Sequence, residues 1–204
     1  MMDIDMFFAA NLIGSAAFAL SGYLVGVRKN LDVMGLFIVA MLTANGGGAL
    51  RDILVNRTPS VLYDQWAFGL VVAVVAFAFF AKLHKRTGVE NHAILVITDA
   101  IGLVAFSVTG ALIGLSAELP LFGVMVLSFI TATGGGIIRD ILVNETPALL
   151  SSDFYGTISL MIAISIFALD AFGLNNNYAI SAVFAVFLAL RLIAFKRGWR
   201  LPQI

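Results

Sequence analysis

Long apolar stretches, separated by short polar connections, run along the whole chain. Leu, Val, Ile, Phe and Ala fill them, and most are apolar around the full helical circumference. A soluble helix bundle would show one polar face per helix, and membrane-spanning strands would alternate with a period of two. The pattern therefore predicts seven transmembrane helices, near residues 6–27, 33–56, 66–83, 93–115, 121–144, 154–172 and 178–195.

The composition agrees with a membrane location and excludes several classes of protein. Of the 204 residues, 61% are hydrophobic and 12% are charged, whereas soluble domains carry roughly 25% charged residues. The 12 basic residues balance 12 acidic ones, so the basic excess typical of nucleic-acid binding is absent. There is no Cys, and no catalytic motif such as a nucleophile elbow, P-loop or HExxH occurs. We expect one integral membrane domain over residues 1–204 that is no enzyme and uses no cofactor.

The distribution of Lys and Arg predicts the orientation in the membrane. Basic residues follow the first, third and seventh spans, at Arg28 and Lys29, at Lys82, Lys85 and Arg86, and at Lys196, Arg197 and Arg200. The connections after the fourth and sixth spans contain no Lys or Arg. Since cytoplasmic loops carry the excess of basic residues, we expect the N-terminus outside and the basic tail, residues 196–204, in the cytoplasm.

An internal repeat organises the first six spans. The segment 46–62 (GGGALRDILVNRTPSVL) returns as 134–150 (GGGIIRDILVNETPALL), with 12 of 17 positions identical at an offset of 88. The offset continues upstream, so residues 6–83 and 93–172 are two copies of one three-helix unit, and the seventh helix stands outside them. Because three spans is an odd number, the second copy is inserted from the opposite side, which is an inverted repeat typical of transporters and channels. A duplicated scaffold without a conduction path is the alternative.

Each copy contains three consecutive glycines inside its second span. They are Gly46, Gly47 and Gly48 in one copy and Gly134, Gly135 and Gly136 in the other. A glycine costs a helix interior about 1 kcal/mol relative to Ala. We expect discontinuous or kinked second and fifth helices, with the triplets facing each other near the protein's centre; close helix packing is the alternative. A break would offer carbonyls to a cation and N–H groups to an anion, so the triplets alone do not choose between a cation pathway and an amino-acid site.

A charged pair follows each triplet, Arg51-Asp52 in one copy and Arg139-Asp140 in the other. Charge within a membrane is costly and indicates function by default. Adjacent residues on a helix do not face each other, so we expect neither pair to close on itself. The pairs are interpreted as two charged vestibules, one on each face of the membrane, or as structural ion pairs to a neighbouring helix.

Further polar residues are candidates for lining a passage. They are Asn11, Ser15, Thr43, Asn45, Asp99, Ser107, Thr131 and Thr133. Asp99 is interpreted either as a solvated residue or as a carboxylate that attracts cations at the inner mouth. The sequences Asn56-Arg57-Thr58-Pro59 and 144–147 are expected to be turns, because Asn and Pro end one element and begin the next.

Seven spans with two copies of G-G-G-x-x-R-D-I-L-V-N-x-T-P resemble the prokaryotic branch of the trimeric intracellular cation channel family, whose domain is also named a bacterial glycine transporter domain. The resemblance covers roughly residues 6–195. It implies a 3+3+1 inverted-repeat fold, a homotrimer with one pore per protomer, kinks at both triplets, and permeation of potassium and other monovalent cations such as sodium. No K-E-V segment occurs, so the lipid regulation of the animal members is not expected.

The expected function is a passive monovalent-cation channel in the lipid bilayer of a bacterial or archaeal plasma membrane, with potassium as a permeating ion. The alternatives are a secondary transporter of glycine or a similar small amino acid, and a trimeric scaffold without flux.

Overall fold

The computed structural model describes residues 4–83, 92–151 and 155–199, and regular structure in these ranges is helical throughout. The long helices are α1 (Ile4–Arg28), α2 (Val33–Leu54), α3 (Gln65–Phe80), α4 (His92–Ser116), α5 (Leu121–Leu142), α7 (Tyr155–Ala171) and α8 (Asn177–Arg197). Two short helices, η1 (Ser60–Leu62) and α6 (Ala148–Ser151), lie in the connections after α2 and α5. The predicted all-α fold is confirmed, and each predicted span has a corresponding helix.

Five of the described helices, α1, α2, α4, α5 and α8, are long and apolar enough to cross a membrane. The helices α3 and α7 have 16 and 17 residues, which at 1.5 Å per residue is roughly 24–26 Å, close to the thickness of a bilayer's hydrocarbon core. Residue 154, the predicted start of the sixth span, lies outside the described residues, as do Lys85, Arg86 and Arg200.

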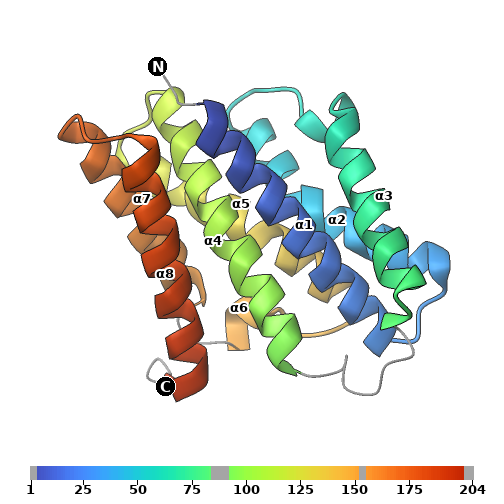
Figure 1. Ribbon diagram of the computed structural model, residues 1–204. Helices are drawn as coiled ribbons and strands as arrows, with labels where there is room; N and C mark the ends of the chain where they lie inside the picture. Colours follow the sequence, from blue (N-terminus) through green and yellow to red (C-terminus); the bar gives the residue numbers. More distant parts are fainter. Residues whose placement is uncertain (1–3, 84–91, 152–154, 200–204) are drawn as a thin grey trace.

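Four helices form the centre of the bundle. The most extensive contacts join α1 to α4, α2 to α5, α1 to α2 and α4 to α5. The helix α3 packs on α1 and α2, and α7 packs on α4 and α5, so that α3 and α7 flank the centre on opposite sides (Figure 1). The two three-helix units are therefore arranged alike, and α8 packs mainly on the second unit, through α4 and α7, with a smaller contact to α1.

Reciprocal contacts show that the two units are inverted relative to each other. A Cβ atom placed on Gly14 of α1 would lie 3.2 Å from the ring of Phe106 on α4, and one on Gly102 of α4 would meet the ring of Phe18 on α1. Gly102 and Phe106 are the repeat equivalents of Gly14 and Phe18, so each residue contacts its equivalent's partner. This exchange requires antiparallel helices related by a pseudo-two-fold axis, and it confirms the predicted inverted repeat.

The Asn-x-Thr-Pro turns end the second helix of each unit as predicted. The backbone leaves the helix at Asn56 and Asn144, whose φ angles are 54° and 55°. Asn is among the few residues that adopt this left-handed conformation readily. After each Pro a short helix begins, η1 in the first unit and α6 in the second.

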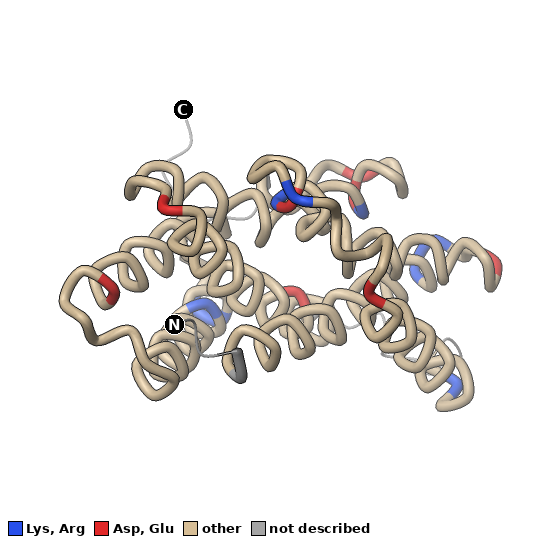
Figure 2. Tube along the Cα trace, turned by 90° about the horizontal axis from the view of Figure 1, so that it is seen from above, with Lys and Arg blue, Asp and Glu red and all other residues tan. Residues whose placement is uncertain are grey.

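Charged residues are sparse on this bundle. Seen from above, most of the trace is uncharged, and Lys, Arg, Asp and Glu occur as isolated segments (Figure 2). In Figure 1, α1 begins at the upper end of the bundle and α8 ends at the lower end, as an odd number of spans requires.

Candidate functional site

The glycine triplets lie where α2 and α5 cross at the centre of the bundle. A Cβ atom on Gly47 would lie 2.1 Å from the carbonyl oxygen of Thr131, and one on Gly135 would lie 2.1 Å from the carbonyl oxygen of Thr43. No side chain fits at such distances, because the obstacle in both cases is backbone. The two triplets face each other, as the sequence predicted.

The expectation of discontinuous helices is wrong. Both α2 and α5 continue as α-helix through their triplets. The physical reason is the crossing itself, since glycines let two helix backbones approach within a membrane protein. Close packing, the alternative left open above, therefore accounts for the triplets; the kinks remain a prediction.

Two cavities lie on either side of this glycine contact. The Arg51 cavity has a volume of about 390 Å³ and includes the early half of α1, with Asn11 and Ser15. The Arg139 cavity has a volume of about 500 Å³ and includes the end of α1, with Val25 and Arg28. Each cavity thus belongs to a different end of the bundle and contains one copy of the repeated Arg-Asp pair.

In the Arg51 cavity, the adjacent residues Arg51 and Asp52 pair directly. Nε and Nη2 of Arg51 donate hydrogen bonds of 2.9 and 2.7 Å to Oδ1 of Asp52. The expectation that neither pair closes on itself is wrong, because the rule concerns the direction in which side chains leave a helix, and a long arginine side chain can bend back to its neighbour. Nη1 of Arg51 is buried and has no hydrogen-bond partner among the described residues.

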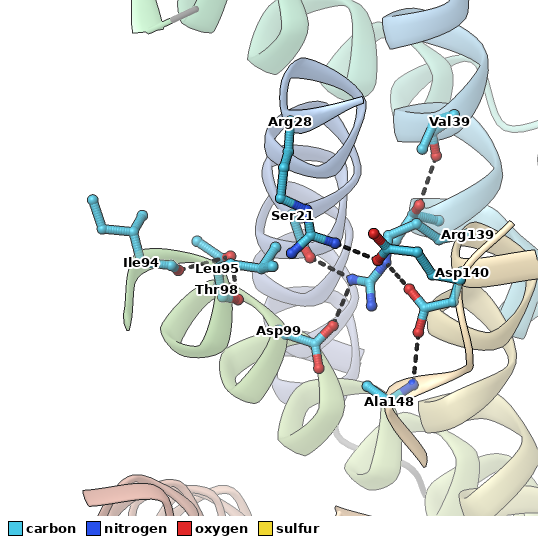
Figure 3. Close-up of polar contacts among 12 residues, drawn as sticks. Ser21, Arg28, Val39, Ile94, Leu95, Thr98, Asp99, Arg139, Asp140 and Ala148 are labelled. Carbon is cyan, nitrogen blue, oxygen red and sulfur yellow. Dashed lines mark hydrogen bonds and ion pairs between the residues drawn. The ribbon is translucent and has the colours of Figure 1, made fainter. Parts of the chain in front are cut away.

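In the Arg139 cavity, the same pair is extended by residues of two further helices (Figure 3). Nε of Arg139 donates to Oδ1 of Asp140 at 2.8 Å, while Nη1 donates to Oδ1 of Asp99 on α4 at 2.7 Å and to the hydroxyl of Ser21 on α1 at 2.6 Å. Only 6% of Asp99 is exposed. The interpretation of Asp99 as a solvated residue is wrong, because α5 brings a guanidinium against it from 40 residues away in sequence. Its interpretation as a carboxylate that attracts cations at the inner mouth stays a prediction.

The aspartates of both pairs also hold the connections that follow the helices. Oδ2 of Asp52 accepts a hydrogen bond from the backbone N–H of Ser60 at 2.9 Å, and Oδ2 of Asp140 accepts one from that of Ala148 at 2.8 Å. Ser60 and Ala148 begin η1 and α6. Each pair is therefore a structural element as well as part of a cavity wall, and the two interpretations of the pairs are compatible.

The cavity walls contain only some of the candidate residues. Those that line the cavities are Asn11, Ser15, Asn45, Gly48, Arg51 and Asp52 in one and Asp99, Arg139 and Asp140 in the other. The hydroxyls of Thr43, Ser107, Thr131 and Thr133 instead donate to the carbonyl four residues earlier in their own helices, at 2.6–2.8 Å. Such local bonds are common for helical Ser and Thr. Of the remaining glycines, Gly46, Gly47, Gly134 and Gly135 belong to the helix crossing, whereas a Cβ atom on Gly136 would lie 3.2 Å from the hydroxyl of Tyr155.

Two residues of the Arg139 cavity, Tyr155 and Arg191, were missed by the sequence reasoning. Ser21 bonds Arg139, and the guanidinium of Arg191 on α8 lies 5.1 Å from the centre of the ring of Tyr155. Arg191 is a charge inside the last apolar span, and this signal could have found it. Nothing in the sequence distinguishes Tyr155 from other aromatic residues at span ends.

An ionic contact joins the two units near the Arg139 cavity. Glu145, in the connection after α5, pairs with Arg28 at the end of α1 and with Nζ of Lys29 at 2.9 Å. In the equivalent place of the first unit, Nη2 of Arg57 lies 3.5 Å from the hydroxyl of Ser116. Partial burial opposes ionisation of Glu145, but the hydrogen bond from Lys29 and the charge of Arg28 outweigh it and lower the pKa of this carboxyl.

An inverted repeat of membrane-crossing helices, with two polar cavities on either side of the helix crossing, is the architecture of a membrane transport protein. The family model described as Glycine transporter matches residues 8–84 and 96–171. The chain belongs to this family.

Relatives in several bacteria share most of the chain. The UPF0126 membrane protein YvgT of Bacillus subtilis is 32% identical over 95% of this chain and 94% of its own. The UPF0126 inner membrane protein YadS of Escherichia coli is 32% identical over 94% of this chain and 93% of its own.

Solved structures of cation channels have the same fold. A prokaryotic TRIC channel in 0.5 M KCl superposes with a TM-score of 0.87 at 31% identity, covering 96% of this chain and 98% of that one. The TRIC trimeric intracellular cation channel orthologue from Rhodobacter sphaeroides gives 0.86 at 32% identity over 95% and 98% of the two chains. The resemblance drawn from the doubled glycine motif is confirmed.

Proposed function

We propose that this chain is a passive channel for monovalent cations, permeable to potassium, which assembles as a homotrimer with one pore in each protomer. The observation that carries the proposal is the pair of polar cavities at opposite ends of the bundle, separated by the contact of α2 and α5 at Gly47 and Gly135. The likeness to cation channels over nearly the whole chain supports it.

The proposed pathway runs from the Arg51 cavity, past the glycine contact, to the Arg139 cavity. With the N-terminus outside, as the basic residues predict, the Arg51 cavity faces the exterior and the Arg139 cavity faces the cytoplasm of a bacterial or archaeal cell. Because the two backbones touch at the glycines, conduction requires α2 and α5 to separate there or to open a passage beside their contact.

The charges of the cavities limit how a cation is selected. The Arg139 cavity contains three acidic residues, Asp99, Asp140 and Glu145, and three arginines. The Arg51 cavity contains two acidic residues and two arginines. Neither has an acidic excess, so selection among ions would depend on neutral oxygens, such as hydroxyls and backbone carbonyls, rather than on a ring of free carboxylates.

Flux measurements on the purified protein in liposomes test the proposal. With potassium inside and an impermeant cation outside, a protonophore lets protons replace the potassium that leaves, and a pH-sensitive dye is quenched. We expect the dye to be quenched only in liposomes that contain the protein, and without any gradient of an organic substrate. Liposomes made with the Asp170→Asn variant, altered at an exposed acid of α7, serve as the matched control.

The rival function is secondary transport of glycine or a similar amino acid, which the description of the family model favours. Saturable uptake of labelled glycine without potassium flux would establish that function instead. The absence of both fluxes from protein that is folded and trimeric would indicate a scaffold.

A further inference from the structure

One arginine nitrogen has partners in one cavity and none among the described residues of the other. In the Arg139 cavity, Nη1 of Arg139 donates to Asp99 and Ser21. In the Arg51 cavity, Nη1 of Arg51 is buried and has no partner among the described residues, although 4% of Arg51 is exposed against 3% of Arg139. The second unit thus supplies a carboxylate to a position that the first leaves without one.

Two substitutions between the copies explain this difference. The repeat equivalent of Asp99 is Asn11, a neutral amide that lines the Arg51 cavity. The equivalent of Tyr155 is Ala67, which lines the same cavity. A Cβ atom placed on Gly136 would lie 3.2 Å from the hydroxyl of Tyr155. A Cβ atom placed on the equivalent Gly48 would have Nη2 of Arg51 as its nearest neighbour, at 3.8 Å. The first substitution replaces a carboxylate by a neutral amide of the same size, and the second removes side-chain atoms and leaves room.

We propose that the Arg51 cavity binds a small carboxylate anion, which takes the place on Nη1 of Arg51 that Asp99 holds on Arg139. Guanidinium and carboxylate groups form charge-assisted hydrogen bonds of matching geometry. The side chains of Asn11 and Ser15 line the cavity and offer further hydrogen-bond donors to such an anion.

The acidic groups of the cavity are already engaged elsewhere. Oδ1 of Asp52 accepts from Nε and Nη2 of Arg51, and its Oδ2 accepts from Ser60. Oδ1 of Asp64 accepts from the backbone N–H groups of Trp66 and Ala67, where it caps α3. The described part of the cavity therefore has no carboxylate placed on Nη1, and a carboxylate from solution meets this requirement. The volume of about 390 Å³ suits a small molecule.

Calorimetric titration of the purified trimer with acetate, in potassium chloride at constant ionic strength, tests the proposal. The chain contains two tryptophans; Trp66 lines the Arg51 cavity and Trp199 the Arg139 cavity. In a Trp199→Phe variant, Trp66 fluorescence reports where the ligand binds. We expect saturable binding of acetate accompanied by a change in Trp66 fluorescence.

The decisive variant is Asn11→Asp, which supplies the carboxylate from the chain itself as Asp99 does in the second unit. It should weaken acetate binding at least about tenfold, since the ligand must compete with an attached carboxylate. Asn176→Asp, the same change at the exposed N-cap of α8, is the matched control and should bind within about threefold of the unmodified protein, since it adds the same charge outside the cavity. Should Asn11→Asp not fold, Ala67→Tyr fills the cavity as Tyr155 does and should produce the same loss.

Several outcomes would overturn the proposal. They are no saturable binding of either acetate or glycine, binding that leaves Trp66 unaffected, equal binding in Asn11→Asp, and an equal affinity for chloride when the background salt is varied. Glycine is titrated in parallel. If both glycine and acetate bind, the site accepts carboxylates in general. If glycine binds and acetate does not, the carboxylate comes from an amino acid. Cation flux is not read in this experiment, so its result is independent of the proposed channel function.

Discussion

The two inverted units have the same arrangement of helices, but they differ in the hydrogen-bond partners of their central arginine. Arg51 is paired with its neighbour on the same helix alone, whereas Arg139 joins three helices through Asp140, Asp99 and Ser21. Duplication thus preserved the arginine, the aspartate and the turn that the aspartate holds. The residues contributed by the other helices diverged.

This difference has a physical consequence. A buried charge that lacks compensation is unfavourable, and an unsatisfied buried donor costs about 1–3 kcal/mol. Arg139 meets that requirement within the protein, and α8 adds Arg191 over Tyr155 beside it. The Arg51 cavity leaves one donor unused. The first unit therefore has an arginine donor available to a ligand, whereas the central arginine of the second unit is bound within the protein.

The largest effect is expected at the contact that both units share. Gly47→Ala places a methyl group 2.1 Å from the carbonyl oxygen of Thr131, so α2 and α5 must move apart, which should cost at least about 3 kcal/mol of stability and abolish flux. Gly48→Ala is the matched control, because its Cβ meets only Nη2 of Arg51 at 3.8 Å. It should be neutral or stabilising by up to about 1 kcal/mol, since Ala favours helix. Thermal unfolding and liposome flux measure both; equal stability of the two variants would contradict the packing role.

A smaller effect is expected where the second unit is made to resemble the first. Asp99→Asn removes the negative charge that Arg139 holds at 2.7 Å and leaves that arginine with Asp140 and the hydroxyl of Ser21, which is closer to the state of Arg51. Because breaking a buried ion pair strands a charge, we expect a loss of about 2–4 kcal/mol and a lower cation flux, since the cavity gains a net positive charge.

Asp170→Asn, at an exposed acid bonded to Asn175, is the control for Asp99→Asn and should change neither quantity. Chemical unfolding monitored by tryptophan fluorescence and flux in liposomes are the measurements. Unchanged stability and selectivity of Asp99→Asn would mean that the Arg139 cluster contributes nothing to the difference between the units.

The smallest effect concerns the ionic contact that the second unit has and the first lacks. Glu145→Gln should lower stability at neutral pH by less than about 1 kcal/mol, because the pair is partly exposed. The neighbouring Lys29 and Arg28 lower the pKa of Glu145 in the folded protein despite its partial burial. Its contribution is therefore complete above the ordinary glutamate pKa of about 4.3 and is lost as the pH falls through the lower folded value.

Melting temperatures of the unmodified protein and of Glu145→Gln, compared at several pH values from neutral to strongly acidic, check this last expectation. The difference between the two proteins should vanish at the acidic end. Arg57→Gln, which alters the equivalent but uncharged contact with Ser116, is the control and should show no pH-dependent difference. A constant difference over the whole range would assign the effect to packing rather than to charge.

Much of the fold followed from local pattern. The all-apolar spans, the offset of 88 between the copies and the odd number of spans in each predicted the helices and their inversion, because these depend on neighbouring residues and on the membrane as solvent. The candidate site was predicted less well. The triplets were correctly placed opposite each other, but they were expected to break helices that in fact continue through them.

The sequence by itself determined the spans, the repeat and which residue types stand in apolar surroundings. Only the tertiary structure decided what those residues touch. Gly47 faces the carbonyl of Thr131, Asp99 meets Arg139, and Arg51 keeps one nitrogen without a partner among the described residues. These contacts join residues from different helices, and a pair of residues far apart in sequence acquires an energy of interaction only when packing brings its helices together.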